Sequence, residues 1–343
     1  MTQNKQAKVP LTQFFQAVDR RLERTGLMPA AAFRVRVCGK LLELRYPNGH
    51  LAEVGKASLV GRITQDSGQP DATFLYWYDQ CDAYLPPGEA AKSSVWKSRD
   101  TTGALQVVTD SGFIIGCDHA RQRYYYARPR PTGTDLLLSS YAMSHSFGRW
   151  ARANGMLMLH AAAVGVQGKG VLIAGKSGSG KSTFAASCLA EGLDFVADDY
   201  SLLSGSGPLR AMPLYTMVSL NPDMCEKLPR FGEPLPKVAG SWLAEKPRFR
   251  MPLSRFCEAL SIHAIVIPAM GGEAPPSIRA VPPGRAMAPL IHSSMTQMEF
   301  YRDTTLIRQI SARLKDLPTY EMHMSADLKK NPAFLRRFIE KEF

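Results

Sequence analysis

A glycine-rich octapeptide in the second half of the chain has the residue types and spacing of a phosphate-binding loop. Its sequence, GKSGSGKS over Gly175–Ser182, matches the pattern G-x-x-x-x-G-K-[ST]. It follows the apolar run Val171–Ala174 and precedes a predicted helix from Lys181 to about Glu191. Glycines let the backbone curl so that successive N–H groups and the helix N-terminus face phosphate oxygens. The pattern therefore predicts binding of ATP, although a Gly/Ser-rich stretch can also be only a flexible turn.

The residues of this loop have separate predicted roles. We expect Lys181 to reach the β and γ phosphates and the Ser182 hydroxyl to complete the coordination shell of Mg²⁺. Lys176 has no required role and can simply be solvated. The predicted nucleotide-binding residues are Gly175, Lys176, Ser177, Gly178, Ser179, Gly180, Lys181, Ser182 and Thr183.

Two adjacent carboxylates, Asp198 and Asp199, follow the apolar segment Phe195–Ala197. Carboxylates at the carboxyl end of a strand lie where ligands bind in open α/β sheets. One can hold Mg²⁺, directly or through water, while its neighbour accepts the proton of an attacking hydroxyl. The alternative is that the pair is a turn or a helix cap. With a phosphate loop upstream, the spacing favours the catalytic interpretation.

His160 directly follows another apolar strand, which ends at Leu159. It would lie near the same site if that strand pairs beside the strand of the phosphate loop. A lone histidine is more often structural, so the residue pattern leaves both readings open.

His160, Gly175–Ser182 and Val196–Asp199 together, with their spacings, resemble the catalytic domain of HPr kinase/phosphorylase. The resemblance covers about 45 contiguous residues well. It weakens through the rest of the C-terminal half, which includes the strand-like Leu317–Met322. The N-terminal half is not the usual regulatory domain of that family. The layout is more similar to the HPr kinase-related proteins, among them the type called kinase B.

The resemblance implies a fold similar to phosphoenolpyruvate carboxykinase and phosphorylation of a serine hydroxyl by ATP. It implies Asp198 as the base, Asp199 as an aid to Mg²⁺ and His160, and His160 as the group that tunes the carboxylates. The catalytic set is thus Asp198, Asp199, His160 and Lys181, with Ser182 and Asp199 at the metal.

Three departures from the family pattern weigh against the dephosphorylating, phosphorolytic activity that the resemblance would also imply. Ala161 replaces a glycine, Thr183 replaces an acidic residue, and no clear Arg-Gly-x-Gly loop follows. Lys246–Arg250 with Arg255 is the best candidate for a basic loop that steadies the transferring phosphate, and a solvated basic surface is the alternative.

The elements around these residues predict an α/β protein. We expect a C-terminal P-loop kinase domain of HPr kinase/PEP carboxykinase-like type with a mixed sheet over residues 131–343, and a smaller β-rich α+β domain over residues 1–130. Residues 11–25 have helical spacing, and residues 33–50 read as two strands that close on Pro-Asn-Gly. A helix is expected over residues 136–155 and a helical tail from residue 306, broken by a strand over residues 319–323. Further strands are expected at residues 73–78, 105–109, 112–117, 123–127, 211–220 and 259–266.

Composition narrows the class of protein. The 343 residues carry a formal net charge of +12, but the basic residues are dispersed and do not favour nucleic-acid binding. The aromatic runs at residues 74–78 and 124–126 suit a buried sheet face better than a base-stacking platform. The chain lacks an apolar run of signal-peptide or membrane-span length, and its six cysteines contain no Cys-x-x-Cys pair, so we expect a soluble, cytoplasmic protein with reduced thiols.

Three functional hypotheses fit the sequence. The first is an ATP-dependent kinase that phosphorylates a serine-type hydroxyl of a protein, peptide or small molecule. The second is a nucleotide-dependent switch or ATPase without a phosphorylated acceptor, and the third is a pseudo-kinase that keeps ATP as a structural ligand. The Asp198-Asp199 pair favours the kinase. Relatives of this kind imply a homo-oligomer, while the identity of the acceptor and the role of the N-terminal half are not encoded in any motif.

Overall fold

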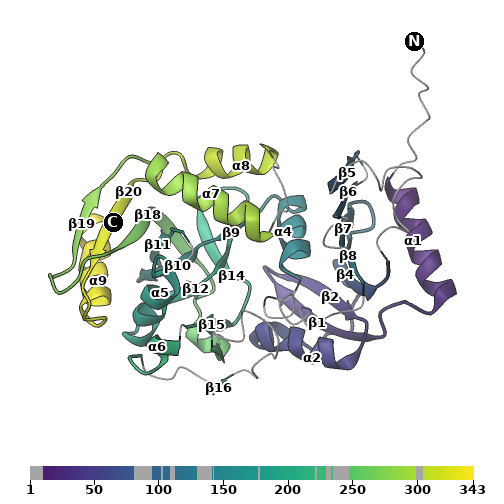
Figure 1. Cartoon of the computed structure of the whole chain (residues 1–343), viewed down its shortest axis with the longest axis horizontal. Coiled ribbons are helices and arrows are strands. Elements are labelled where there is room, and N and C mark those ends of the chain that lie inside the picture. Colours follow the sequence, from purple (N-terminus) through teal and green to yellow (C-terminus); the bar gives the residue numbers. More distant parts are fainter. Residues whose placement is uncertain are drawn as a thin grey trace, which may run out of the picture. The chain divides into compact units, whose positions relative to one another are not determined.

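The chain separates into two compact units, formed by residues 1–56 with 63–150 and by residues 57–62 with 151–343. Figure 1 shows the helices and strands of both units. The assignment of domains at residues 1–130 and 131–343 stays a prediction. The computed structural model describes residues 11–80, 95–101, 103–108, 113–129, 141, 143–176, 178–220, 222–228, 233–234, 247–298 and 304–343.

The described part of the first unit is built on an eight-stranded sheet in the order β3-β1-β2-β4-β8-β7-β6-β5. The strands expected from alternating apolar residues are all present, and β2 with β4 and β4 with β8 run parallel while the other pairs are antiparallel. The strands are β1 (Ala31–Val37), β2 (Lys40–Tyr46), β3 (Ile63–Thr64), β4 (Ala72–Tyr78), β5 (Val95–Arg99), β6 (Gly103–Val108), β7 (Phe113–Asp118) and β8 (Arg123–Arg128).

Aromatic side chains form the core of this unit on both faces of the sheet. The amphipathic helix α1 (Leu11–Thr25), predicted from its spacing, stacks Phe15 on Tyr125 with ring centroids 4.5 Å apart. On the other face, Phe74 packs against Phe147 of α4 (Ser144–Ala153) at 4.7 Å. The rings of residues 74, 76, 77 and 124–126 are buried, which confirms the core interpretation and excludes these rings as a base-stacking platform.

The turn between β1 and β2 corrects one expectation. It lies at Cys38 and Gly39, which have positive φ values of 50° and 77°, and not at Pro47-Asn48-Gly49. The latter segment begins a helix that we did not predict, α2 (Gly49–Ser58). The Asn48 side chain accepts a hydrogen bond from the N–H of Leu51 at 3.0 Å, so it caps the helix instead of closing a hairpin.

The described part of the second unit contains a nine-stranded mixed sheet in the order β12-β10-β11-β18-β14-β13-β9, with β20 paired to β18 and β19 paired to β20. Pairs β11–β18 and β18–β20 are parallel, and the others are antiparallel. The strands are β9 (Leu157–His160), β10 (Ala162–Val166), β11 (Lys169–Ile173), β12 (Asp194–Ala197), β13 (Tyr200–Leu203), β14 (Arg210–Pro213), β18 (Leu260–Met270), β19 (Ser277–Ala280) and β20 (Thr319–Met324).

Helices cover both faces of this sheet. On one face, α5 (Lys181–Ala190) and α9 (Lys330–Glu342) bury Phe184 and Leu335 in one apolar cluster. On the other face, α7 (Gly284–Met298) and α8 (Thr304–Leu314) bury Leu290 and Ile310 in a second cluster. The short segments η1 (Val60–Arg62), α6 (Pro222–Cys225) and η4 (Leu253–Arg255) accompany a small sheet of β15 (Met217–Ser219), β16 (Glu233–Pro234) and β17 (Arg248–Arg250).

Some predicted elements have different bounds. The apolar run over residues 211–220 is not one strand, because the chain leaves the main sheet after β14 and enters the small sheet at β15. The strand expected over residues 259–266 extends to Met270, since its second half pairs with β20. The helix expected over residues 136–155 is observed from Ser144 to Ala153, and residues 136–140 lie outside the described residues.

Two bent strands run antiparallel through the middle of the second unit. Residues 157–166 form β9 and β10 with a break at Ala161, and residues 194–203 form β12 and β13 with a break at Asp198-Asp199. The register continues across the breaks, from Ala163 opposite Ala197 to His160 opposite Tyr200, after a shift between Ala163 and Val164. The acidic pair therefore interrupts one bent strand beside the point where Ala161 interrupts the other.

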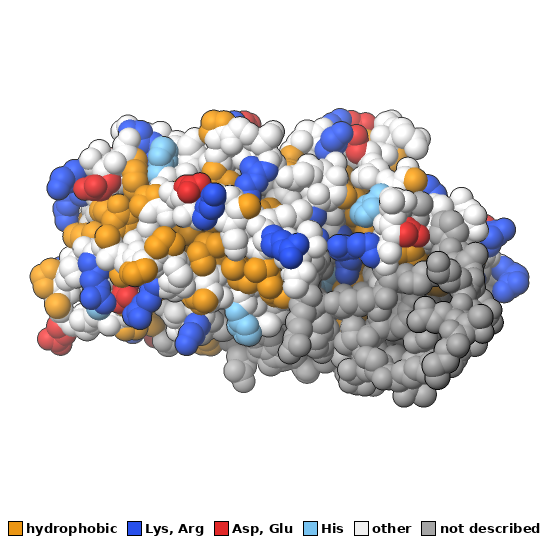
Figure 2. Space-filling model, turned by 90° about the horizontal axis from the view of Figure 1, so that it is seen from above, with side chains coloured by type: hydrophobic (Ala, Val, Ile, Leu, Met, Phe, Trp, Pro, Cys, Tyr) orange, Lys and Arg blue, Asp and Glu red, His pale blue; other side chains and the backbone are white. Residues whose placement is uncertain are grey.

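On the face that Figure 2 shows, the Lys and Arg side chains of the described residues are scattered among apolar and uncharged ones. This agrees with their dispersed positions in the sequence. In the part of the chain that the structure describes, every helix is too short or too polar to cross a lipid bilayer.

Candidate functional site

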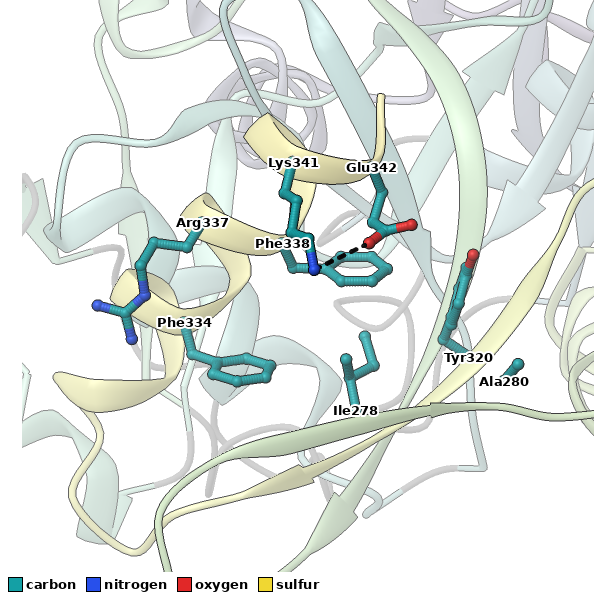
Figure 3. A pocket seen from close by; sticks show the side chains of 8 residues that line it. All are labelled: Ile278, Ala280, Tyr320, Phe334, Arg337, Phe338, Lys341 and Glu342. Atoms are coloured by element: carbon teal, nitrogen blue, oxygen red, sulfur yellow. Dashed lines mark ion pairs between the residues drawn. The ribbon is translucent and has the colours of Figure 1, made fainter.

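A hollow between β19 and α9 is lined by none of the predicted catalytic, nucleotide-binding or metal-binding residues. Its volume is about 410 Å³, and aromatic and basic side chains surround it (Figure 3). The lining residues are Ile278, Ala280, Tyr320, Phe334, Arg337, Phe338, Lys341 and Glu342.

The loop after β11 has the backbone shape that the phosphate-loop pattern requires. Gly178 and Gly180 have φ values of 78° and 88°, a region that favours glycine. Gly180 lies immediately before α5, and its carbonyl accepts the N–H of Phe184 at 2.8 Å. A Cβ atom on Gly175 would lie 2.5 Å from the Ser179 hydroxyl, so a side chain here would force that hydroxyl to move. Ser177 lies outside the described residues.

Lys181 is buried at the first turn of α5 and folds back over the loop. Its Nζ donates hydrogen bonds to the carbonyl of Gly175 at 3.0 Å and to that of Lys176 at 3.1 Å. A buried ammonium is costly unless anionic or polar groups surround it. Its position within the loop therefore suits a side chain that meets the negative charge of phosphate.

The Ser179 hydroxyl supports the same use of the loop. Its Oγ is buried and has no hydrogen-bond partner within the described residues. Buried polar atoms are normally paired, so an orphaned hydroxyl at this position fits a ligand that brings oxygen atoms into the loop. The triphosphate of ATP is such a ligand.

The same loop can accommodate Mg²⁺. Ser182 and Thr183 are partly exposed in the first turn of α5, and the Asp199 side chain is 20% exposed. No cluster of three or more His, Cys, Asp or Glu side chains able to hold a metal occurs in the described ranges. Mg²⁺ is usually bound through one or two carboxylates together with substrate phosphates, so a serine hydroxyl and one carboxylate fit this ion.

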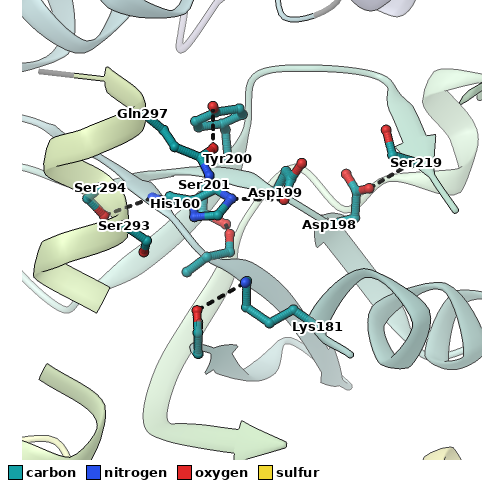
Figure 4. A network of polar contacts seen from close by, with 12 residues as sticks. His160, Lys181, Asp198, Asp199, Tyr200, Ser201, Ser219, Ser293, Ser294 and Gln297 are labelled. Carbon is teal, nitrogen blue, oxygen red and sulfur yellow. Dashed lines mark hydrogen bonds and ion pairs between the residues drawn. The ribbon is translucent and has the colours of Figure 1, made fainter. Parts of the chain in front are cut away.

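The carboxylates of Asp198 and Asp199 have different environments. Asp198 is buried, and its Oδ2 accepts the N–H of Ser219 in β15 at 2.8 Å. Asp199 is partly exposed, and its Oδ1 lies 3.1 Å from Nε2 of His160 (Figure 4). A backbone N–H fixes the orientation of one carboxylate, and an imidazole contacts the other. Two adjacent carboxylates in unlike surroundings can therefore take different roles.

Strand pairing brings His160 to the acidic pair, but by a different route from the one expected. β9 does not pair with β11. It pairs with β13, and His160 lies opposite Tyr200, the residue after Asp199. Because β10 is antiparallel to both β11 and β12, those two strands point the same way, and the loop and the acidic pair leave the sheet at the same edge. The loop, the acidic pair and the histidine thus lie at the same edge of the sheet.

Helix α7 contributes residues that the sequence did not indicate. The Ser294 Oγ accepts the N–H of His160 at 3.0 Å, and the Gln297 Oε1 accepts the hydroxyl of Tyr200 at 3.0 Å (Figure 4). Burial raises the pKa of Tyr200, and the nearby charges of Asp199 and Asp198 raise it further. Tyr200 therefore stays protonated and donates its hydrogen bond. Ser294 is 134 residues from His160 in sequence, so a local sequence pattern could not have predicted the contact.

The predicted basic segment separates into two parts. Arg248 is buried in β17 and lies opposite Ser219, whose N–H contacts Asp198. Arg255 instead donates a hydrogen bond to the carbonyl of Leu189 at 3.2 Å, near the C-terminal end of α5. That end is the one away from the phosphate loop. Lys246 lies outside the described residues. Among the described residues of this segment, Arg248 is therefore linked to the acidic pair through Ser219, whereas Arg255 is not.

Comparison of the sequence with protein-family models and with curated proteins found no match. Among solved structures the chain is similar to the HPr(Ser) kinase/phosphatase from Coxiella burnetii. The TM-score is 0.30 with 12% sequence identity, and the match covers 54% of this chain and 99% of that chain. A TM-score this low carries no argument about chemistry, so the candidate site rests on the residues and contacts of this chain.

Proposed function

We propose that this protein is an ATP-dependent phosphotransferase that transfers the γ-phosphoryl group to a serine-type hydroxyl of a protein, peptide or small-molecule acceptor. The observation that carries the proposal is one shared sheet edge. The loop that matches the phosphate-binding pattern, with its buried Lys181, leaves the sheet at this edge. So do the consecutive residues Asp198 and Asp199, and Asp199 contacts the buried His160. A phosphate cradle alone would suit any nucleotide-binding protein. The carboxylate pair supplies the further group that transfer to a hydroxyl requires.

Each residue has a defined part in the transfer. The loop N–H groups and Lys181 hold the phosphates, and Asp198 acts as the base. The acceptor oxygen attacks the γ-phosphorus, and the bond from that phosphorus to the oxygen bridging to the β-phosphate breaks. ADP leaves with the bonding electron pair, while the proton of the acceptor hydroxyl passes to Asp198. The contact with Ser219 keeps the Asp198 carboxylate oriented for this step.

Mg²⁺, held by Ser182, Asp199 and the phosphates, would neutralise charge on the β and γ phosphate oxygens. His160 holds Asp199 through Nε2 and thereby sets the orientation of that carboxylate. Ser294 fixes the backbone of His160 from α7. The proposal thus uses the roles that the sequence predicted for five residues, which are His160, Lys181, Ser182, Asp198 and Asp199.

The proposal is tested by incubating the protein with γ-labelled ATP, Mg²⁺ and a cell lysate, and by following label in acceptors and free phosphate. The Asp198→Asn variant should bind Mg²⁺-ATP normally and transfer about a hundredfold more slowly or worse, because the base is lost while the cradle remains. Lys181→Ala should instead lose tight Mg²⁺-ATP binding, measured by calorimetry.

Asp194→Asn is the matched control, since Asp194 begins β12 at the end opposite Asp198 and its Oδ2 accepts the N–H of Gly168. Full transfer by Asp198→Asn would contradict the proposed mechanism. Release of phosphate without a labelled acceptor would favour the nucleotide-dependent switch or ATPase.

A further inference from the structure

A cavity of about 540 Å³ lies between the phosphate loop and α7. Lys176 forms its wall on the loop side. On the α7 side, the lining residues come in adjacent pairs that follow one another every four residues, about one helical turn. They therefore form one stripe along the helix. The α7 residues that line it are Ala288, Pro289, His292, Ser293, Thr296 and Gln297.

Both walls of this cavity are tied to the candidate site. The carbonyl of Lys176 accepts a hydrogen bond from Lys181, so the Lys176 backbone belongs to the phosphate cradle while its side chain is exposed and lines the cavity. On the α7 side, Gln297 accepts the hydroxyl of Tyr200, which directly follows the acidic pair. A molecule in the cavity would therefore lie between the cradle and the helix that supports His160.

We propose that this cavity binds the phosphate acceptor, and that the acceptor is a small hydroxyl-bearing metabolite with an anionic group. The inference rests on the proposed function. A volume of about 540 Å³ falls within the range of small-molecule sites, roughly 300–1,000 Å³. The acceptor's hydroxyl faces the acidic pair, and its proton and the γ-phosphoryl group move as described above.

The lining sets the chemistry of this acceptor. Lys176 places an ammonium at the wall, and none of the described lining residues is acidic. A carboxylate or phosphate on the acceptor would form a charge-assisted hydrogen bond with that ammonium. Ser293, Thr296 and Gln297 offer neutral hydrogen-bonding groups, and the adjacent Ala288 and Pro289 offer apolar contact. This combination suits a hydroxy acid or a sugar phosphate better than a cationic or wholly apolar molecule.

The test uses substitutions on α7 that fill the cavity with a bulky side chain and leave the residues of the phosphate loop unchanged. A lysate is divided by ultrafiltration into a low-molecular-mass fraction and a macromolecular fraction, and each is incubated with the full chain, γ-labelled ATP and Mg²⁺. Ala288→Trp places an indole in the cavity from an exposed helix position. Ala312→Trp is the matched control, because it makes the same change at an exposed position of α8 that does not line the cavity. Thr296→Trp is a second filling variant should the first fold poorly.

We expect label in a low-molecular-mass compound with the wild-type chain and Ala312→Trp, and at least a tenfold loss with Ala288→Trp, while all three bind Mg²⁺-ATP equally. Lys176→Gln should raise the KM for that fraction about tenfold, since one charge-assisted contact is lost. When the low-molecular-mass fraction is passed over an anion exchanger before the assay, the compound that accepts the label should be retained, because the proposed acceptor is anionic.

Three results would overturn the inference while leaving the kinase intact. The first is label that is confined to macromolecules and is not reduced by either filling variant. The second is acceptor activity that passes through the anion exchanger without being retained. The third is loss of Mg²⁺-ATP affinity in the filling variants, which would assign the cavity to the nucleotide. If the wild-type chain and Asp198→Asn both label nothing in either fraction, the proposed function itself fails and the inference fails with it.

Discussion

His160 and Asp199 illustrate how the fold brings together residues that are far apart in the sequence. Their side chains meet at 3.1 Å although they are 39 residues apart, and the histidine side chain is almost fully buried. The Nδ1 of His160 is also buried and has no hydrogen-bond partner in the described ranges. Nε2 is thus the ring atom through which the histidine contacts the acidic pair.

A double-mutant cycle measures that contact. His160→Ala and Asp199→Asn should each lower kcat/KM for transfer, and the double variant should lose less than the sum of the two effects. We expect a coupling of about 1–2 kcal/mol, because the two residues act as a unit. His160→Ala should still fold, which circular dichroism can verify.

Asp194→Asn serves as the control in the same cycle, since Asp194 lies at the far end of β12 and its effect should add to that of His160→Ala. Additive losses for His160 and Asp199 would show that the contact has no part in catalysis. Gross unfolding of His160→Ala would support a purely structural histidine.

At the scale of elements, the tight packing of β10 against β11 places the phosphate loop. Gly165 in β10 lies opposite Gly170, and a Cβ atom at Gly165 would lie 2.2 Å from the carbonyl oxygen of Lys169. The obstructing atom belongs to the backbone, so no side-chain rotation can relieve the clash. The two strands can approach this closely only because residue 165 is glycine.

Gly165→Ala should therefore lower the free energy of unfolding by about 1–3 kcal/mol, as overpacking does in other well-packed interiors. Gly284→Ala at the start of α7 is the control, since an added Cβ atom there meets nothing within 4 Å. Denaturant unfolding followed by fluorescence compares the two variants. Equal stability would show that the β10–β11 pair tolerates a wider spacing.

A second element-scale feature joins β20 to its neighbours. Glu321 is buried on β20 and pairs with Arg279 of β19 at 3.2 Å and with Arg285 of α7 at 3.1 Å. Burial by itself would raise the pKa of this carboxyl, but the hydrogen bonds and charges of Arg279 and Arg285 hold it below the ordinary value. The carboxylate form is therefore favoured in the folded protein.

A carboxyl with a lowered folded-state pKa contributes stability above its unfolded pKa, and this stability is lost as the pH falls through the folded pKa. Glu321→Gln should be less stable than the wild type at pH 7, and the difference should close as the pH falls below about 4.5, the ordinary glutamate value. Glu340→Gln on the exposed side of α9 should show no such pattern. Urea midpoints at a series of pH values test this, and a constant difference would contradict it.

At the scale of the whole molecule, the net charge of +12 should guide anionic ligands. We expect the association rate of Mg²⁺-ATP to fall severalfold as the ionic strength rises, because salt screens the field of the chain. Stopped-flow binding of a fluorescent ATP analogue measures the rate, with the corresponding uncharged nucleoside as control. Equal salt dependence of both ligands would exclude electrostatic guidance.

Much of the fold followed from local residue patterns. Helical spacing predicted α1, and the glycine pattern placed the loop between β11 and α5. Apolar patterns predicted six strands of the first unit, β1, β2, β4, β6, β7 and β8, but not the short strand β3 or β5. The turn at Cys38-Gly39 and helix α2 were missed, because a Pro-Asn-Gly segment suits both a hairpin and the start of a helix. Residues 211–220 were read as one strand, since an apolar run does not reveal where the chain changes sheet.

The sequence by itself determined the glycine-rich loop over residues 175–182 and the place of the acidic pair, because each is a contiguous motif whose backbone shape depends on its own residues. Only the tertiary structure decided how His160 reaches Asp199, through the pairing of β9 with β13, and that α7 supports both His160 and Tyr200 through Ser294 and Gln297. Those contacts join segments up to 134 residues apart. They depend on strand register and helix packing, which arise from burial across the whole unit and leave no signature in local spacing.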